Sequence, residues 1–329
     1  MTVVPGSIPR IILSSSMKWT SLLKTKKNQK NIFVFVKLIL FVGVIFVLFE
    51  QIRRFDHEAW NSFVLIRPLS FFLAVILVFP NIWLAFLKWK ITLTSIGIYS
   101  DSALRVQSFF AGIVTGMLTP NMIGNFIGRF YYFERKHRPQ IVVFTMLSNF
   151  SQFLASVTFG TIAIMILGKV LVLDSSQEVV TLLFVVLLLS YLTYFFLDNF
   201  LARFKARQTT RVFHEILKQN RSYRLKLLGL SFGRFFLFTT QFSLMLNAFG
   251  AEWNLTLIAS IWQIYLITML APSLFLGKIG IKESISLFVL GALGLNVVSI
   301  LFSSLVIWFV NSMLPALVGL AICRNQLKE

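Results

Sequence analysis

The sequence predicts an all-α, polytopic integral membrane protein with about eight transmembrane helices. Of its 329 residues, 57% are hydrophobic and only 13% are charged, whereas a soluble domain has roughly 45 to 50% apolar residues with glycine included. Such a composition cannot cover a water-soluble surface, which excludes a soluble enzyme. The 36 phenylalanines exclude a disordered chain, because disordered segments are poor in aromatics. The lipid bilayer is the environment that remains.

The predicted spans are windows of about 20 mostly apolar residues, the length that crosses a hydrocarbon core of roughly 30 Å. They lie near residues 31–50, 69–88, 140–168, 178–197, 227–249, 255–273 and 297–322. We therefore expect a transmembrane domain over residues 31–322, a basic tail at 1–30 and a short terminus at 323–329. The apolar run in the tail is too short for a secretory signal, so we expect the tail to be retained in the cytoplasm.

A first broken apolar stretch covers residues 103–134. The residues that mark the break are Pro120, Asn121, Gly124, Asn125, Gly128 and Arg129. A complete crossing would leave a proline and an asparagine in lipid, where irregular backbone is tolerated only inside protein or beside a cavity. The pattern therefore favours two half-helices that enter and leave on the same side.

A second broken stretch covers residues 271–296. Its marking residues are Pro272, Gly277, Lys278, Gly280, Lys282 and Glu283. The stretch is either a re-entrant turn or a short, tilted span. Both breaks run proline, glycine, glycine, charge, and they lie about half the chain apart. Breaks at corresponding places in two halves are typical of a transporter binding site at a repeat interface, so the sequence predicts a two-half internal repeat.

The basic residues indicate the orientation. Most of the 31 Lys and Arg residues fall in the segments expected in the cytoplasm, which are 1–30, 88–105, 129–138, 198–226, 278–283 and 323–329. The positive-inside rule then predicts that both termini are cytoplasmic, in the plasma (inner) membrane, with an even number of crossings. The net charge of +19 follows this topology loop by loop. Binding of nucleic acid is therefore not needed to explain it.

The basic segment 198–226 also contains an apolar strip. Val212, Phe213, Ile216 and Leu217 form this strip. We expect an interfacial helix there, with its basic face on the anionic membrane surface.

The two breaks resemble motifs of a known family. The stretch from Leu118 to Tyr132 is similar to the first motif of the lysylphosphatidylglycerol synthase transmembrane-region family, also called the flippase-like domain family. The stretch from Pro272 to Ser284, followed by 291–294, is similar to its second motif, and 83–90 resembles the aromatic-basic end of its second helix. The resemblance covers roughly 31–322 and implies lipid handling, since family members stand beside phospholipid, polyprenyl-linked sugar and hopanoid pathways.

The chain departs from the family pattern in two ways. Many members have an acid directly after the first motif glycine, where this chain has the neutral Asn125. That difference argues against a role that needs a carboxylate at the first break. The short terminus at 323–329 leaves no room for the aminoacyl-transferring domain fused to some relatives, so we expect lipid handling rather than lipid aminoacylation.

The candidate site residues are those whose burial in a membrane is expensive. An ionisable side chain there costs at least about 2.5 to 3.5 kcal/mol and is by default a functional hypothesis. The basic side chains on the breaks lie beside the N–H groups at the starts of half-helices. Together they favour binding of an anionic head group. The predicted lipid-binding residues are Pro120, Asn121, Gly124, Asn125, Gly128, Arg129, Pro272, Gly277, Lys278, Gly280, Lys282, Glu283 and Arg234. The alternative is that the charged ones anchor helices at the cytoplasmic border and snorkel.

Enzyme chemistry has little support in the sequence. The three histidines, His57, His137 and His214, fall in separate loops, and no phosphate-binding or dinucleotide-binding glycine motif is present. We therefore expect no cofactor and no metal.

Two alternatives to a transporter or flippase remain open. One is a membrane-embedded transferase that uses Asp56 and Glu58 in the first outer loop. The other is a scaffold for a lipid-modifying partner. The expected partners are a phospholipid or polyprenyl-linked lipid and the membrane surface, and a homo-oligomer is compatible with the sequence.

Overall fold

The computed structural model describes residues 63–119, 122–170, 173–174, 177–203, 221–271 and 280–324, and these residues are almost entirely helical. The helices are α4 (Pro68–Ile76), α5 (Val78–Ser95), α6 (Ser102–Met117), α7 (Gly124–Phe130), η2 (Arg135–His137), α8 (Arg138–Leu167), α9 (Gln177–Arg203), α11 (Arg221–Ala248), α12 (Leu255–Leu270), α13 (Ile281–Gly291), α14 (Val297–Trp308), η4 (Phe309–Met313) and α15 (Leu314–Arg324). A two-residue antiparallel pair, β1 (Lys169–Val170) and β2 (Leu173–Asp174), links α8 to α9. The all-α prediction is confirmed.

Among the described residues, four helical stretches are long and apolar enough to cross a membrane. They are Pro68–Ser95, Arg135–Leu167, Gln177–Phe196 and Val297–Cys323. The predicted windows at 227–249 and 255–273 are also helical, as α11 and α12, but α12 has only 16 residues and α11 contains four basic residues. The window at 31–50 lies outside the described residues. Eight crossings and an internal repeat therefore stay predictions.

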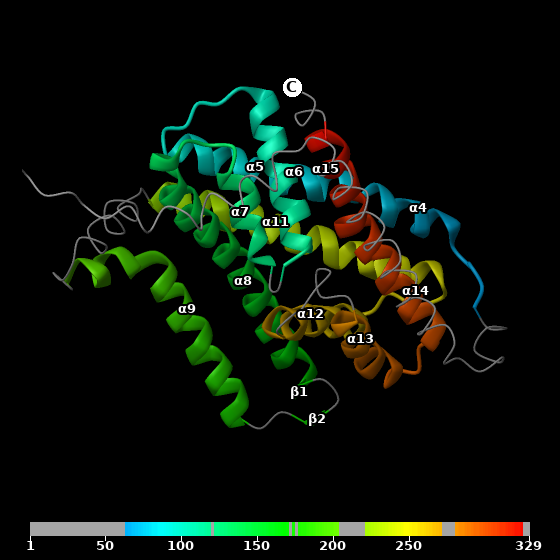
Figure 1. Cartoon of the computed structure of the whole chain (residues 1–329). Helices are drawn as coiled ribbons and strands as arrows, with labels where there is room; N and C mark the ends of the chain where they lie inside the picture. The colour runs from blue at the N-terminus through cyan, green and yellow to red at the C-terminus, as the bar shows by residue number, and fades with distance from the viewer. Residues whose placement is uncertain are drawn as a thin grey trace, which may run out of the picture.

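Helix α11 is the centre of the bundle (Figure 1). It packs against α4, α5, α8, α12 and α14. Its buried face includes Phe235 and Phe242, both fully covered. Helix α9 lies at the edge of the bundle beside α8 (Figure 1), and most of its apolar side chains are exposed, as expected of a helix that faces lipid. Any polar group on the inner face of α11 is consequently in the interior of the protein.

The first break folds as a helical hairpin of α6 and α7. Gly124 and Gly128 lie against α6 so closely that a Cβ on either would collide with the backbone of that helix, at the carbonyls of Thr115 and Ala111 respectively. The Thr115 hydroxyl donates to the carbonyl of Gly124 at 2.6 Å, which joins the two helices. The predicted half-helix pair is thus present as a hairpin, while Pro120 and Asn121 lie outside the described residues.

Replacing Gly128 with alanine should open this hairpin. The added methyl group would meet the Thr115 hydroxyl and the Ala111 carbonyl, so we expect the free energy of unfolding to fall by about 1 to 3 kcal/mol. Denaturation in mixed micelles would measure the loss. Gly229→Ala is the matched control, because a Cβ on Gly229 meets nothing within 4 Å. Equal stability of the two variants would contradict the close-packing role of Gly128.

The second break joins α12 to α13. Pro272, Gly277 and Lys278 lie outside the described residues, and α13 begins directly after Gly280, which has a positive φ of 85°. At 1.5 Å per residue, the 11 residues of α13 extend only about 16 Å. Because a bilayer core is roughly 30 Å thick, α13 alone is too short to cross it. Its length favours the re-entrant alternative.

Candidate functional site

Three basic side chains come together inside the bundle, and we call them the cation cluster. Lys88 belongs to α5, Arg129 to α7 and Arg234 to α11. Lys88 and Arg129 are only 4% and 8% exposed, and Arg234 is half-buried. Lys88 donates to Ser231, one turn before Arg234 on α11, and Arg129 lies over the ring of Trp89, the residue after Lys88, so the three charged groups are near one another. Within the part of the chain that the structure describes, no Asp or Glu forms an ion pair with any of them.

Lys88 is held by neutral oxygen atoms from two neighbouring helices. Its Nζ donates to the carbonyl of Ser148 at 2.8 Å and to the hydroxyls of Ser151 and Ser231 at 3.2 and 2.7 Å. The two serines are also hydrogen-bonded to each other at 2.7 Å. Lys88 of α5 is therefore bonded to both α8 and α11, and it brings a positive charge that these neutral partners do not cancel.

Arg129 lies on aromatic rings instead of on acceptors. Its Cζ is 4.8 Å from the ring centroid of Trp89 and 5.6 Å from that of Phe109, which are cation–π contacts. The Nε of Arg129 is buried without a hydrogen-bond partner among the described residues. Gly112 of α6 leaves the space for this side chain, since a Cβ there would lie 2.6 Å from the Cγ of Arg129.

Arg234 begins a chain of side-chain hydrogen bonds across the bundle. Its Nε donates to the Oδ1 of Asn81 at 3.0 Å, and the Nδ2 of Asn81 donates to the Oδ1 of Asn311 at 2.6 Å. Asn311 donates in turn to the Oε1 of Gln241 at 3.1 Å. Asn311 lies in η4, a π-helical turn, and such turns are frequent at functional sites.

The residues of the second break form a separate centre. The Nζ of Lys282 lies 4.3 Å from the ring centroid of Phe242 on α11 and 5.2 Å from that of Tyr265 on α12. Glu283 is 1% exposed and accepts from the backbone N–H of Gly280 at 2.6 Å and from the hydroxyl of Ser304 at 3.0 Å. Arg129 and this pair do not meet.

The hydrogen-bond chain ends on α11, next to a residue of the second centre. It runs from Arg234 to Gln241, and the residue after Gln241 is Phe242, which contacts Lys282.

The helix starts are occupied by the protein itself. The N–H of Gly124 donates to the Thr119 hydroxyl at 2.6 Å, and the N–H of Gly280 donates to Glu283. An anion would have to displace these internal acceptors to use the two N–H groups. The side chains of the cation cluster are therefore the stronger candidates for an anion site.

Sequence reasoning missed Lys88 and misplaced Arg224. Both were counted among cytoplasmic loop charges, but Lys88 is in the interior and Arg224 is 1% exposed, with its Nη1 donating to the carbonyl of Tyr194 at 2.8 Å. Tyr194 donates back to the carbonyl of Arg224 at 3.0 Å, which attaches the peripheral α9 to α11. The spacing of Asn81 and Lys88, two helical turns apart, is the signal that could have placed Lys88 on an inward face.

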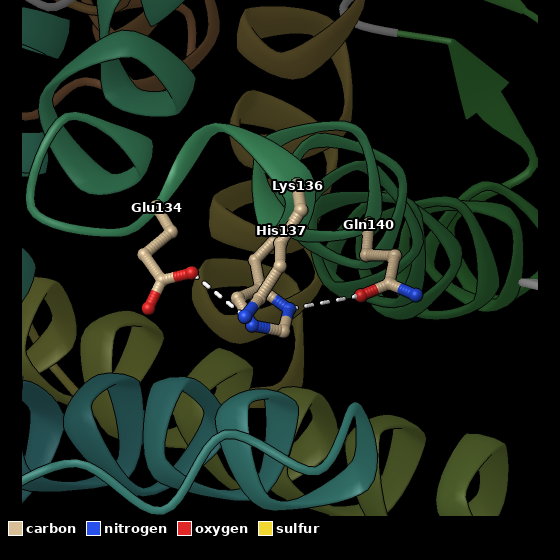
Figure 2. A network of polar contacts seen from close by, with 4 residues as sticks. All are labelled: Glu134, Lys136, His137 and Gln140. Atoms are coloured by element: carbon tan, nitrogen blue, oxygen red, sulfur yellow. Dashed lines mark hydrogen bonds and ion pairs between the residues drawn. The ribbon is translucent and has the colours of Figure 1, made fainter.

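The basic turn before α8 carries an exposed ion pair. Figure 2 shows the turn before α8, where Lys136 and Glu134 form an ion pair of 2.7 Å and His137 contacts Gln140 at 3.4 Å. Lys136 holds the pKa of Glu134 below its usual value. Both side chains are about two-thirds exposed or more, so this pair contributes little to stability. The apolar strip at residues 212–217 lies outside the described residues.

Comparison with known proteins gives this chain no relative. A scan against protein-family models finds no match, and a search of the curated proteins finds none either.

Proposed function

We propose that this chain is an integral protein of the plasma (inner) membrane that carries a lipid with an anionic head group between leaflets. The observation that supports the proposal is the cation cluster, a set of two buried cations and one half-buried cation without a carboxylate partner among the described residues. Burying such charges is costly, and intramembrane cations usually mark a substrate or ion pathway. The resemblance of both breaks to the flippase-like domain family is consistent with this function.

The proposed mechanism assigns one task to each side chain. Arg129 and Arg234 present guanidinium N–H groups to the head group, because neither is paired with a carboxylate in the described part of the chain. Lys88 contributes charge from a fixed position. The acyl chains stay in the bilayer while the polar part passes through the bundle.

The sequence contains no ATP-binding motif. Energy would come from a lipid gradient, a proton or the membrane potential, which is worth about 2.3 kcal/mol per charge per 100 mV.

Lipid movement in reconstituted vesicles tests this function. The wild-type protein should move a fluorescent anionic phospholipid to the outer leaflet, and Arg129→Ala should slow that movement about tenfold, as the loss of a charged hydrogen bond predicts. Asp56→Ala should leave it unchanged. If Asp56→Ala abolishes activity while Arg129→Ala does not, the transferase function replaces the transport function. Vesicles without protein give the background rate.

A further inference from the structure

We propose that the cation cluster binds a phosphate group with two negative charges, as in a phosphate monoester or a diphosphate. This inference rests on the proposed function only for the source of the phosphate, which we take to be a lipid head group. It narrows the class of lipid, because most membrane phospholipids are phosphodiesters with a single phosphate charge.

The first argument is the balance of charge. Lys88 bonds to Ser231, one turn before Arg234, and Arg129 lies over the ring of Trp89, the residue after Lys88, so three cations are near one another here. None has a carboxylate partner among the residues that the structure describes. A phosphate monoester carries about −1.5 to −2 at neutral pH. A phosphodiester, with one negative charge, would leave most of the repulsion in place. Since charge interactions are stronger in the interior than in water, the difference favours the doubly charged anion.

The second argument is the number of donors. Arg129 makes no hydrogen bond within the described part of the chain, although it is only 8% exposed. Among the described residues, Arg234 uses only its Nε, on Asn81, so its two terminal nitrogens have no partner there. Guanidinium groups bind phosphate oxygens in pairs. Two such forks match the three terminal oxygens of a monoester better than the two free oxygens of a diester.

The third argument is the neutral residue one turn before Arg129. The Oδ1 of Asn125 is buried without a partner in the described structure. A Cβ on Gly112 would lie 2.7 Å from this Oδ1 and 2.8 Å from the Nε of Arg129, so both atoms pack closely against Gly112. A carboxylate at Asn125 would pair with Arg129 there. Because the residue is an amide, the charge of Arg129 is left for a ligand.

Calorimetric titration of the full-length protein in detergent tests the inference. The probes are dihexanoyl phosphatidic acid, a monoester, dihexanoyl phosphatidylglycerol, a diester, and inorganic phosphate. We expect phosphatidic acid to bind at least about tenfold more tightly than phosphatidylglycerol. Asn125→Asp, which preserves shape, should reduce this preference to less than about threefold by pairing with Arg129. Equal affinity for the two lipids, or an unchanged preference in Asn125→Asp, would overturn the proposal.

Two control variants distinguish the proposed effect from a general change in charge or a loss of folding. Lys90→Gln lowers the net charge by the same amount on the exposed side of α5, and it should leave the preference unchanged. If Asn125→Asp lowers the unfolding midpoint, Arg129→Lys takes its place. That variant keeps the charge but removes the fork, and it should weaken phosphatidic acid binding; undiminished binding would contradict the role of the fork.

The titration with inorganic phosphate shows whether the cluster binds the phosphate of a lipid head group or the free ion. If inorganic phosphate binds as tightly as phosphatidic acid, the cluster is a phosphate site but its ligand is the free ion, and the lipid source fails. Binding of phosphatidic acid without lipid movement in vesicles would support the phosphate site and contradict the transport function. Movement of phosphatidylglycerol and phosphatidic acid at equal rates, with equal affinities, would leave transport standing and refute the charge selectivity.

Discussion

Glu283→Ala should lower the free energy of unfolding by about 3 kcal/mol, the largest stability loss we expect from a single substitution in the two centres. The Glu283 carboxylate accepts two hydrogen bonds, from the N–H of Gly280 and from the hydroxyl of Ser304. Both donors would be left in the interior without their acceptor, at about 1 to 3 kcal/mol each. Denaturation in mixed micelles, followed by tryptophan fluorescence, would measure the change.

Glu283→Gln is the matched control for that experiment. Glutamine can accept from the N–H of Gly280 and donate to the Ser304 hydroxyl, so both contacts can persist without the charge. We expect it to retain most of the wild-type stability. If glutamine destabilises the protein as much as alanine does, then it is the negative charge beside Lys282, rather than the hydrogen bonds, that stabilises α13.

Lys88→Met should reduce the rate of lipid movement by about 10- to 100-fold, the largest functional effect we expect. The loss of one charged group from an anion site is worth about 1.5 to 3 kcal/mol, which corresponds to that range. Rates in reconstituted vesicles, at equal protein content, would measure the effect. The prediction presupposes the proposed function.

The same variant should unfold almost like the wild type. After the substitution, the hydroxyls of Ser151 and Ser231 can still donate to the backbone carbonyls of Ser148 and Leu227, so neither is left without a partner. Replacing a buried charge by an apolar side chain of similar volume is often neutral or stabilising. Lys90→Met, on the exposed side of α5, controls for the loss of a lysine. Wild-type lipid movement by Lys88→Met would show that the cluster does not handle the head group.

The positions of most long helices could be predicted from the apolar windows, because a run of about 20 apolar residues is long enough to form a helix that crosses a membrane. The hairpin of α6 and α7 was also foreseeable, since Gly124 and Gly128 are spaced one turn apart on the face that meets α6. The ends of α9 and α11 were not predicted. Both helices extend into the basic segment 198–226, as far as Arg203 and from Arg221, because the reciprocal bonds between Tyr194 and Arg224 stabilise turns that charge alone would assign to a loop.

The candidate site was predictable only in part. Arg129 and Arg234 could be singled out because each is a lone cation among apolar neighbours. Lys88 is harder to single out, because it stands beside Lys90 at the end of an apolar window, where a lysine usually snorkels. Only its spacing of two helical turns from Asn81 suggests an inward face. Its interior position depends on oxygen atoms from residues 60 and 143 positions away, and contacts at such separations are not encoded in any local pattern.

The π-helical turn η4 sets a register for the last part of the chain. Each residue of an α-helix rotates the following residues by about 100°, so a chain with one residue fewer in Phe309–Met313 would turn α15 by that angle relative to α14. Gly319 of α15 packs against the carbonyl of Phe110 on α6, whereas Asn311 must face Asn81 and Gln241. A regular helix cannot satisfy both directions at once. The surplus residue in this turn thus lets one helix make both contacts, that of Gly319 with α6 and that of Asn311 with Asn81 and Gln241. A sequence without this residue would lose one of the two contacts.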